Sequence, residues 1–493
     1  MGRASATSPA RGGAGALYRH RWPLSAVGLL VVALAVVKWA GTRPGYDPYG
    51  WLAWGHLTIH GRLDTNGAPS WKPLPFLFTV PYALLGRPAL TLWMVTAFAV
   101  SLSGVAFAWR VAFVLVGAPP ERRYAAYVAG LVAGLAVLGI DQYLHSVLSA
   151  ESDTMIVALC LAAVDGSLHR RYGWAFWAWW LAALGRPEVW APMGLFVIWA
   201  WRERPALRRQ MTIGIVLLPV LWFGIPALTS KSPFSAASLA QNSPRELHGN
   251  KVTGTISRFL GLDAAAVKLA ALIAVALAGL RRDRPVLLVA GGVMLWVAVE
   301  TAFALHGWPA VPRYMFEAAA ATGVLAGVFA GRVILDAPLV VTWVRRRLPA
   351  RAWPARLTTP RAGGWAAVIV LALFTVALFG AARERLAVER TDLTAQRART
   401  REIGLLATVV DRLGGTRRIL ACGQPQIGIA WQSILAWDLE TNTGRLYVSA
   451  KHEREHPRPL VNLYAHSYGW QAFPSNWTSA AQAARCRGLS YRT

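Results

Sequence analysis

Apolar residues fall in long blocks along most of the chain, and short polar gaps separate these blocks. Most blocks reach about 17–25 residues, the length that an α-helix needs to cross the ~30 Å hydrocarbon core of a bilayer. The pattern therefore predicts an all-α polytopic membrane protein with about eleven transmembrane helices. The shorter blocks between 173 and 201 could instead be tilted or re-entrant. The expected spans are residues 22–41, 88–117, 124–140, 153–168, 173–185, 189–201, 211–228, 264–280, 285–304, 314–335 and 364–382.

Arginine and lysine gather in alternating polar gaps. Such residues mark the cytoplasmic loops of membrane proteins, so their placement predicts the orientation of the chain. Under this threading the basic N-terminus, residues 1–21, is cytoplasmic and the C-terminus is extracytoplasmic. The outer side then receives loops at 42–87, 141–152 and 229–263, together with a long tail. The basic gaps are 19–21, 122–123, 170–171, 202–209, 281–284 and 345–361.

Composition supports this membrane assignment and changes the meaning of the net charge. Charged residues make up only 15% of the 493 positions, whereas soluble domains carry roughly 25%. The net charge of +27 could indicate a nucleic-acid partner, but the basic residues alternate between gaps rather than forming one soluble face. We therefore expect no nucleic-acid partner and a multi-pass protein of the bacterial plasma membrane.

The tail at 383–493 differs from the rest of the chain because polar and charged residues run throughout it. Residues 383–412 have helix-compatible spacing and predict a helical stalk. Short apolar runs at 418–421 and 446–448, bounded by Gly and Asn, are typical of strands. The sequence therefore predicts a transmembrane domain at 22–382 and a small extracytoplasmic α+β domain after it.

The three cysteines agree with this division. Cys422 and Cys486 both lie in the tail and would face an oxidising compartment, where they could form a disulfide. Cys160 lies inside a predicted span and is expected to act as a small apolar residue.

The first outer loop places a carboxylate, Asp47, a few residues after the first predicted span. Tyr46, Tyr49 and Trp51 surround it in the sequence. Aromatic rings stack on the C–H faces of sugars, and a carboxylate can accept a hydroxyl proton as a general base. The segment therefore favours a sugar site with Asp47 as its base. The alternative is that Asp47 begins a helix at Pro48, since Asp followed by Pro is typical of a helix start.

The same loop contains two further candidate binding residues. His56 follows the aromatic residues, and Lys72 lies in a run at 67–75. This run is too rich in proline for a regular helix, so we expect a shaped loop at the membrane interface. The Lys72 ammonium group could bind a phosphate; the alternative is a lysine that snorkels to the lipid headgroups.

The second outer turn contains Asp141, Glu151 and Asp153 within a short stretch. Carboxylates at a membrane edge are costly to keep, so they indicate a function. Glu151 and Asp153 could bind a divalent metal, because hard cations take oxygen ligands. The alternative is that Ser152 or Asp153 caps the helix that follows.

Two later segments interrupt apolar stretches on the same side. Arg186 and Glu188 could form a mutual ion pair or contribute to a site. His306, Arg313 and Tyr314 precede a late span, and Arg313 has no acidic residue beside it in the sequence. A guanidinium in this position favours a lipid phosphate as its anion. Binding of acidic phospholipid headgroups is the alternative.

Agreement among these weak signals predicts one outward-facing polar site. The orientation was derived from lysine and arginine alone, yet it brings all of the candidates to one side. A channel or transporter would carry ionisable residues through its spans, whereas the middles of these spans are almost free of charge. The charged candidates are Asp47, Glu151, Asp153, Arg186, Glu188 and Arg313.

With these residues in place, the chain resembles the GT-C superfamily of integral-membrane glycosyltransferases. The shared pattern is an acidic residue soon after the first span, here Asp47, and a second acidic site in a later outer loop, here Glu151 and Asp153. An Arg-Tyr step at Arg313 and Tyr314 and a C-terminal extracytoplasmic domain complete the resemblance. The chain is most similar to the actinobacterial arabinofuranosyl- and mannosyltransferases of the cell wall.

The resemblance implies an inverting transfer of a sugar from a polyprenyl-phosphate donor to a cell-envelope glycan or glycolipid acceptor. Asp47 would be the general base, and Arg313, with Arg186 and Lys72, would bind the donor phosphate. Donors with a single phosphate often need no metal, so a divalent ion stays an open alternative. The implied substrate-binding residues are Tyr46, Tyr49, Trp51, His56, Glu151, Asp153, Glu188, His306 and Tyr314.

Two points stay open within this reading. The second acidic site is a very short Glu-Ser-Asp turn, which departs from the family pattern and leaves its role undecided. The tryptophans of the tail could form a glycan-binding platform or could pack in the domain core. They are Trp431, Trp437, Trp470 and Trp477.

Two other functions would use the same scaffold. One is a non-catalytic translocase of lipid-linked intermediates, which should carry polar residues through its spans. The other is an assembly partner that keeps a GT-C-like shell without activity, and such a protein should tolerate Asp47→Asn.

Overall fold

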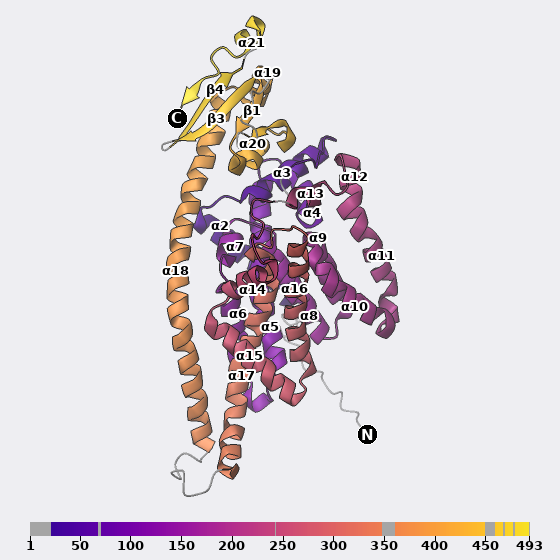
Figure 1. Cartoon of the computed structure of the whole chain (residues 1–493), viewed down its shortest axis with the longest axis vertical. Helices are drawn as coiled ribbons and strands as arrows, with labels where there is room; N and C mark the ends of the chain where they lie inside the picture. Colours follow the sequence, from indigo (N-terminus) through magenta and orange to yellow (C-terminus); the bar gives the residue numbers. More distant parts are fainter. Residues whose placement is uncertain are drawn as a thin grey trace, which may run out of the picture.

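The computed structural model describes residues 21–67, 71–241, 243–347, 360–448, 459–466, 469–476 and 479–492. Predictions about the basic N-terminus at 1–20, most of the arginine-rich gap at 345–361 and Trp477 lie outside the described residues. The described part forms a bundle of helices with a small domain of helices and strands at one end (Figure 1).

A helix forms over every segment that the hydropathy pattern predicts to span the membrane. Among the described residues, six helices are long and apolar enough to cross a membrane, or seven if the bent pair α14 (Lys251–Leu262) and α15 (Ala265–Arg281) is one span. The chain is thus a polytopic membrane protein, although the predicted eleven crossings exceed the number that helix length alone supports. The helices over the predicted spans, with α11 and α12 together covering one span, are α2 (Arg21–Ala40), α5 (Ala89–Val116), α6 (Tyr124–Leu138), α8 (Asp153–Leu168), α9 (Tyr172–Gly185), α10 (Trp190–Glu203), α11 (Arg208–Pro219), α12 (Ile225–Thr229), α15 (Ala265–Arg281), α16 (Arg284–Leu305), α17 (Phe316–Arg347) and α18 (Pro360–Arg412).

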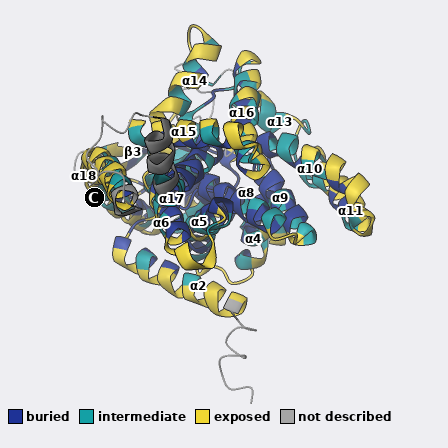
Figure 2. Cartoon of the chain, turned by 90° about the horizontal axis from the view of Figure 1, so that it is seen from below, coloured by how far each residue is buried: buried dark blue, intermediate teal, exposed yellow. Residues whose placement is uncertain are grey.

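Small residues allow the central helices to pack closely. Gly323, Gly327 and Gly331 recur every four residues along α17 and face α6. A Cβ atom at Gly327 would overlap the backbone oxygen of Ala129 on α6, so glycine permits this approach. Such close contacts are a main source of helix association in membranes, where lipid tails are as apolar as leucine. Figure 2 shows the buried residues concentrated in the central helices and the exposed ones on the peripheral α2, α11 and α14.

The first outer loop, predicted at 42–87, folds into two helices, α3 (Tyr46–Ile59) and α4 (Pro73–Ala83). The end of the proline-rich run, from Pro73 to Pro75, therefore already belongs to α4. Proline is tolerated there because the first turn of a helix makes no use of its N–H groups. Helix α3 packs against α4 and against the C-terminal domain, which gives the loop a fixed shape.

The other outer segments are also partly helical. The turn at 141–152 contains α7 (Tyr143–Leu148). The loop at 229–263 contains α13 (Ser235–Ala240) and α14 (Lys251–Leu262), which meets α15 at 102°.

Helix α18 joins the last predicted span to the predicted stalk without a break. Its 53 residues give a length of roughly 80 Å at about 1.5 Å per residue. Figure 1 shows it running along one side of the bundle to the C-terminal domain. On the way, the Arg397 Nε donates a hydrogen bond to the Ala40 carbonyl oxygen at 2.8 Å, and Arg399 donates to that of Pro44 at 2.8 Å. The stalk is therefore attached to the start of the first outer loop.

The C-terminal domain contains a five-stranded mixed sheet with the strand order β2-β1-β3-β4-β5. Strand β1 is parallel to β2 and β3, whereas β3 and β4 form an antiparallel hairpin. This confirms the predicted small domain of mixed structure. The elements are α19 (Gly415–Cys422), β1 (Gln424–Ile427), α20 (Gln432–Asp438), β2 (Tyr447–Val448), β3 (Leu460–His466), β4 (Gly469–Ser475), α21 (Ala480–Arg485) and β5 (Tyr491–Arg492).

One predicted strand of this domain is wrong. The run at 418–421 belongs to helix α19, because its buried residues Ile419 and Cys422 are three apart and so share one helix face. Cys422 forms a disulfide with Cys486, which connects α19 to the end of α21. Trp470 is 1% exposed and packs edge-on against Trp431, so these two rings belong to the domain core rather than to an open platform.

Candidate active site

Charged side chains from five separate segments meet at the end of the bundle that faces the C-terminal domain. All of these side chains lie at or near helix ends. There the chain can bring charged groups together without placing a charge in the middle of a span. Asp47 lies in the first turn of α3, Lys72 precedes α4, Glu151 and Asp153 lie at the start of α8, Arg186 and Glu188 follow α9, and Arg313 precedes α17.

Asp153 is the centre of this cluster. Its carboxylate is fully buried and its Oδ1 accepts a hydrogen bond from the Arg186 Nε at 2.9 Å and another from the Arg186 Nη2. The Lys72 Nζ lies 3.7 Å from the same oxygen, and the Arg313 Nε lies 3.8 Å from Oδ2. Three cations from different segments therefore converge on one carboxylate. Their mutual repulsion is offset only because Asp153 lies between them.

Arg313 connects this centre to the predicted base. Its Nη2 lies 3.7 Å from the Asp47 Oδ2, while its Nε contacts Asp153. The two side chains are partly exposed, at 26% for Arg313 and 17% for Asp47. The structure thus brings together the predicted base and the predicted phosphate-binding arginine, and it leaves both accessible.

Arg186 is more enclosed than Arg313. It is 3% exposed, its Nη1 lies 3.3 Å from the Glu188 Oε1, and its guanidinium lies 3.8 Å from the centre of the Tyr314 ring. The contacts with both Asp153 and Glu188 saturate most of its donors. The geometry favours Arg186 as the residue that holds Asp153 and Glu188 in place.

Two buried carboxyl groups near Arg186 were not predicted from the sequence. Glu300 on α16 is 1% exposed and within hydrogen-bonding reach of Glu188, and Glu317 on α17 is 6% exposed and faces Arg186. Each is a single acidic residue near a helix end and belongs to no motif. Their cost in an apolar setting was the only signal that could have identified them.

Glu151 lies beside the cluster in a tight turn. The Gly45 N–H donates a hydrogen bond to the Ser149 carbonyl oxygen at 2.7 Å, and this brings Gly45 against the Glu151 carboxyl. Ala150, directly before Glu151, has φ of +53°, a backbone conformation that residues other than glycine rarely adopt. Burial, reinforced by the nearby Asp47 carboxylate, raises the pKa of Glu151 to about 8.

Five of the predicted substrate-binding residues lie away from the cluster or are covered. Trp51 is fully buried and packs edge-on against Trp93, and Tyr49 is 2% exposed. Neither therefore has a ring face open to a sugar. His56 lies 3.5 Å from Glu440 of the C-terminal domain, and the exposed His306 is hydrogen-bonded to its own helix. Tyr46 also faces the C-terminal domain.

The described residues contain no group of three or more His, Cys, Asp or Glu side chains arranged to hold a metal ion. Asp153, one of the two carboxylates considered for a metal, is already surrounded by cations. A donor set that faces three positive charges is poorly suited to a divalent ion. The cluster instead suits a small anion that can share these cations.

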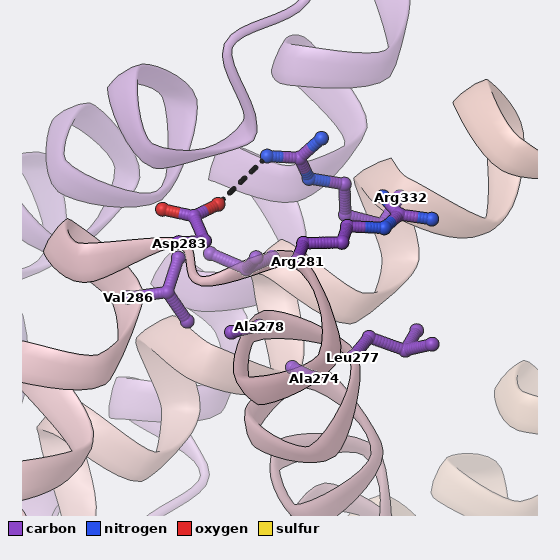
Figure 3. Close-up of a pocket in the computed structure, with 8 residues that line it drawn as sticks. Ala274, Leu277, Ala278, Arg281, Asp283, Val286 and Arg332 are labelled. Atoms are coloured by element: carbon purple, nitrogen blue, oxygen red, sulfur yellow. Dashed lines mark hydrogen bonds and ion pairs between the residues drawn. The ribbon is translucent and has the colours of Figure 1, made fainter.

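A small cavity occurs far from this cluster, between α15, α16 and α17 (Figure 3). Arg332 at its edge donates a hydrogen bond to the Asp283 carboxylate at 2.9 Å. The nearby Arg281 is paired with Asp336 at 2.8 Å. Arg332 is 19 residues beyond Arg313 along the chain, or roughly 28 Å of helix at about 1.5 Å per residue. The cavity is thus separate from the candidate site.

Comparison with known proteins identifies the fold. No family model and no curated protein matches the sequence. The chain is similar to ArnT from Cupriavidus metallidurans in a crystal structure bound to undecaprenyl phosphate, with a TM-score of 0.50 and 15% identity over 90% of this chain and 93% of that chain. The apo ArnT structure gives a TM-score of 0.49 and 16% identity over 89% and 93% of the two chains. The protein therefore has a GT-C-type fold.

Proposed function

We propose that the protein transfers a sugar from a polyprenyl-phosphate donor to a cell-envelope glycan or glycolipid. The observation that carries this proposal is the convergence of Lys72, Arg186 and Arg313 on Asp153, with Asp47 in contact with Arg313. A phosphate monoester at a membrane surface matches a cluster of this charge. The likeness to a structure of ArnT bound to undecaprenyl phosphate supports the same class of donor.

The proposed reaction uses the three partly exposed side chains of the cluster, Asp47, Lys72 and Arg313. The Asp47 carboxylate accepts the proton of an acceptor hydroxyl, and the hydroxyl oxygen forms a bond to the anomeric carbon of the donor sugar. The bond from this carbon to the phosphate oxygen breaks, and its electron pair leaves with the phosphate. Because attack and departure occur on opposite faces of the sugar, the anomeric configuration inverts.

Lys72 and Arg313 stabilise the charge that develops on the leaving phosphate. Both have partly exposed side chains and only long contacts to Asp153, at 3.7 and 3.8 Å. A phosphate that enters between them would make shorter, charge-assisted hydrogen bonds with both. Arg186 would not contact the phosphate but would hold Asp153 in position, because its donors already face Asp153 and Glu188.

We place this chemistry on the extracytoplasmic side, with the N-terminus in the cytoplasm. The alternating basic gaps and the Cys422–Cys486 disulfide support this orientation. A cysteine at the exposed position Thr408 should react with a membrane-impermeant maleimide in intact cells. Reaction only after permeabilisation would contradict the orientation.

The direct test of the function is sugar transfer by the purified protein in lipid vesicles. Labelled polyprenyl-phosphate arabinose and polyprenyl-phosphate mannose are the first donors to supply, because the resemblance noted in the sequence is to transferases of these two sugars. We expect label to move from the donor to an envelope glycolipid acceptor. Movement of the intact donor across the vesicle membrane without transfer would instead support a translocase.

A further inference from the structure

The Glu151 carboxyl is buried beside the cluster but has no role in the proposed reaction. Its side chain belongs to the turn between α7 and α8 and is 7% exposed. One carboxyl oxygen, Oε1, lies against Gly45, and the other, Oε2, has no hydrogen-bond partner among the described residues. A buried polar atom without a partner is costly, so its presence in a fixed turn indicates a ligand contact.

Charged groups from several elements act on Glu151. The Asp47 carboxylate of α3 and the Asp153 carboxylate of α8 disfavour a negative charge on Glu151, whereas Arg313 and Lys72 favour one. Arg399 of α18 also faces it. Burial dominates these effects and raises the pKa of the Glu151 carboxyl to about 8. Burial thus favours the protonated, neutral form of this carboxyl at neutral pH.

A neutral Glu151 carboxyl would avoid placing a third negative charge in this cluster. Asp47 and Asp153 already place two carboxylates beside the position where the donor phosphate would enter. A third carboxylate would repel the phosphate, whereas a protonated carboxyl offers an O–H donor. A carboxylic acid kept neutral by its surroundings so that it can donate a hydrogen bond is a known device of enzyme sites.

We propose that Glu151 is an uncharged hydrogen-bond donor to the phosphate of the polyprenyl-phosphate donor, an inference that rests on the proposed function. The Glu151 O–H would donate to a phosphate oxygen, while Lys72 and Arg313 supply the positive charge. No proton is transferred in this role. Loss of the proton turns the donor into a third anion, so affinity for the lipid phosphate falls as the pH rises through about 8.

The test is the binding of undecaprenyl phosphate to the full-length protein in detergent between pH 6.5 and 9.5. The probe's own second ionisation, with a pKa near 6, is only about three-quarters complete at pH 6.5 but about nine-tenths complete at pH 7, so affinities are compared from pH 7 upward. Wild-type affinity should fall roughly 10-fold or more from pH 7 to pH 9.5, the size expected for loss of a hydrogen bond to a charged group. Glu151→Gln keeps a neutral N–H donor, so its affinity should stay within about 3-fold of wild type at pH 7 and should not fall at high pH.

Two further variants make the result decisive. Glu151→Ala should bind roughly 10-fold or more weakly at pH 7, because it removes the donor. Asp141→Asn, in the same outer turn, should keep the wild-type pH dependence. The inference is overturned if Glu151→Gln keeps the loss of affinity at high pH, or if Glu151→Ala binds as tightly as wild type. Each variant's thermal unfolding midpoint separates these results from misfolding.

This binding measurement is independent of the transfer assay. If wild type binds with the expected pH dependence but transfers no sugar from any supplied donor, the proposed function fails and the Glu151 contact stands as a property of the lipid-phosphate site. If wild type transfers sugar but Glu151→Gln has the same pH dependence as wild type, the function stands and the Glu151 inference fails.

Discussion

The Tyr46 hydroxyl donates a hydrogen bond to the Gln432 side-chain oxygen at 3.0 Å, across 386 residues of sequence. Tyr46 immediately precedes the proposed base, and Gln432 begins α20 of the C-terminal domain. The nitrogen of the same amide donates to the Thr443 carbonyl oxygen at 3.0 Å, so Gln432 is itself fixed. The C-terminal domain therefore helps to position the loop that carries Asp47.

Other contacts of the C-terminal domain extend along the same loop. Asn442 donates a hydrogen bond to the Asp64 carbonyl oxygen at 2.6 Å, and Glu440 lies 3.5 Å from His56. Burial lowers the pKa of His56 below its usual value, with Glu440 acting in the opposite direction. These contacts attach both ends of α3, which explains how a short loop helix can hold the proposed base, Asp47, in a defined position.

Removing the Tyr46 hydroxyl should reduce turnover without weakening donor binding. In Tyr46→Phe the ring stays in place and one hydrogen bond is lost, so kcat should fall roughly 2- to 10-fold. The KM for the lipid-linked donor should stay near the wild-type value, because the proposed phosphate-binding residues, Lys72 and Arg313, are elsewhere. Gln432→Ala should have a similar effect, and the double variant should be no worse than either single one. Additive losses in the double variant would show that the two side chains act separately.

The close contact between Gly45 and Glu151 predicts a second effect. A methyl group at position 45 would overlap the Glu151 carboxyl, so Gly45→Ala should displace that side chain and weaken lipid-phosphate binding roughly 10-fold. Gly28→Ala on α2 is the matched control, because a Cβ atom there meets nothing within 4 Å. Equal affinities for undecaprenyl phosphate in the two variants would contradict the role given to this turn.

Arg186 should matter for stability more than for substrate contact. Arg186→Met removes the partner of two buried carboxylates, Asp153 and Glu188. An uncompensated buried charge of this kind typically costs about 3–5 kcal/mol. We expect a clearly lower thermal unfolding midpoint in detergent. Lys72→Met, which removes a more exposed and more distant partner of Asp153, should lower donor affinity but leave the midpoint within a few degrees of wild type.

The disulfide should stabilise the C-terminal domain. It closes a segment of 64 residues, and chain-entropy arguments give roughly 4 kcal/mol for a loop of that size. Replacing Cys422 and Cys486 by alanine should make the domain sensitive to limited proteolysis. Cys160→Ala is the control, since that thiol is free and lies inside α8. Equal protease resistance in both variants would show that the disulfide adds little.

The sequence was informative where physical signals are local. Long apolar blocks predicted the helices because hydrophobic length and helix formation are properties of one segment. Asp47, Asp153 and Arg313 were identifiable because a charge beside an apolar block is costly and therefore conspicuous. The run at 418–421 was misread because four residues cannot distinguish the period of a strand from that of a helix.

Relationships between distant segments could not be predicted in this way. Glu300 and Glu317 are single carboxyls near helix ends, and nothing in their own segments indicates that they face Arg186. Tyr46 was expected to contact substrate. Its hydrogen bond to Gln432 could not be predicted, because that bond depends on how the C-terminal domain docks. The continuity of α18 was also missed, since its composition changes from apolar to charged while its helical propensity stays high.

The central claim is that Asp47 is the base for sugar transfer, and Asp47→Asn tests it most directly. The change keeps the size of the side chain but removes its ability to accept a proton at neutral pH. Asp64→Asn is the matched control, because Asp64 lies in the same loop and its Oδ1 only accepts hydrogen bonds from Asn66. With a labelled polyprenyl-phosphate sugar and equal amounts of protein in membranes, Asp47→Asn should lower the transfer rate at least about 100-fold, and Asp64→Asn should retain most of it. Transfer by Asp47→Asn at a rate near wild type would contradict the account.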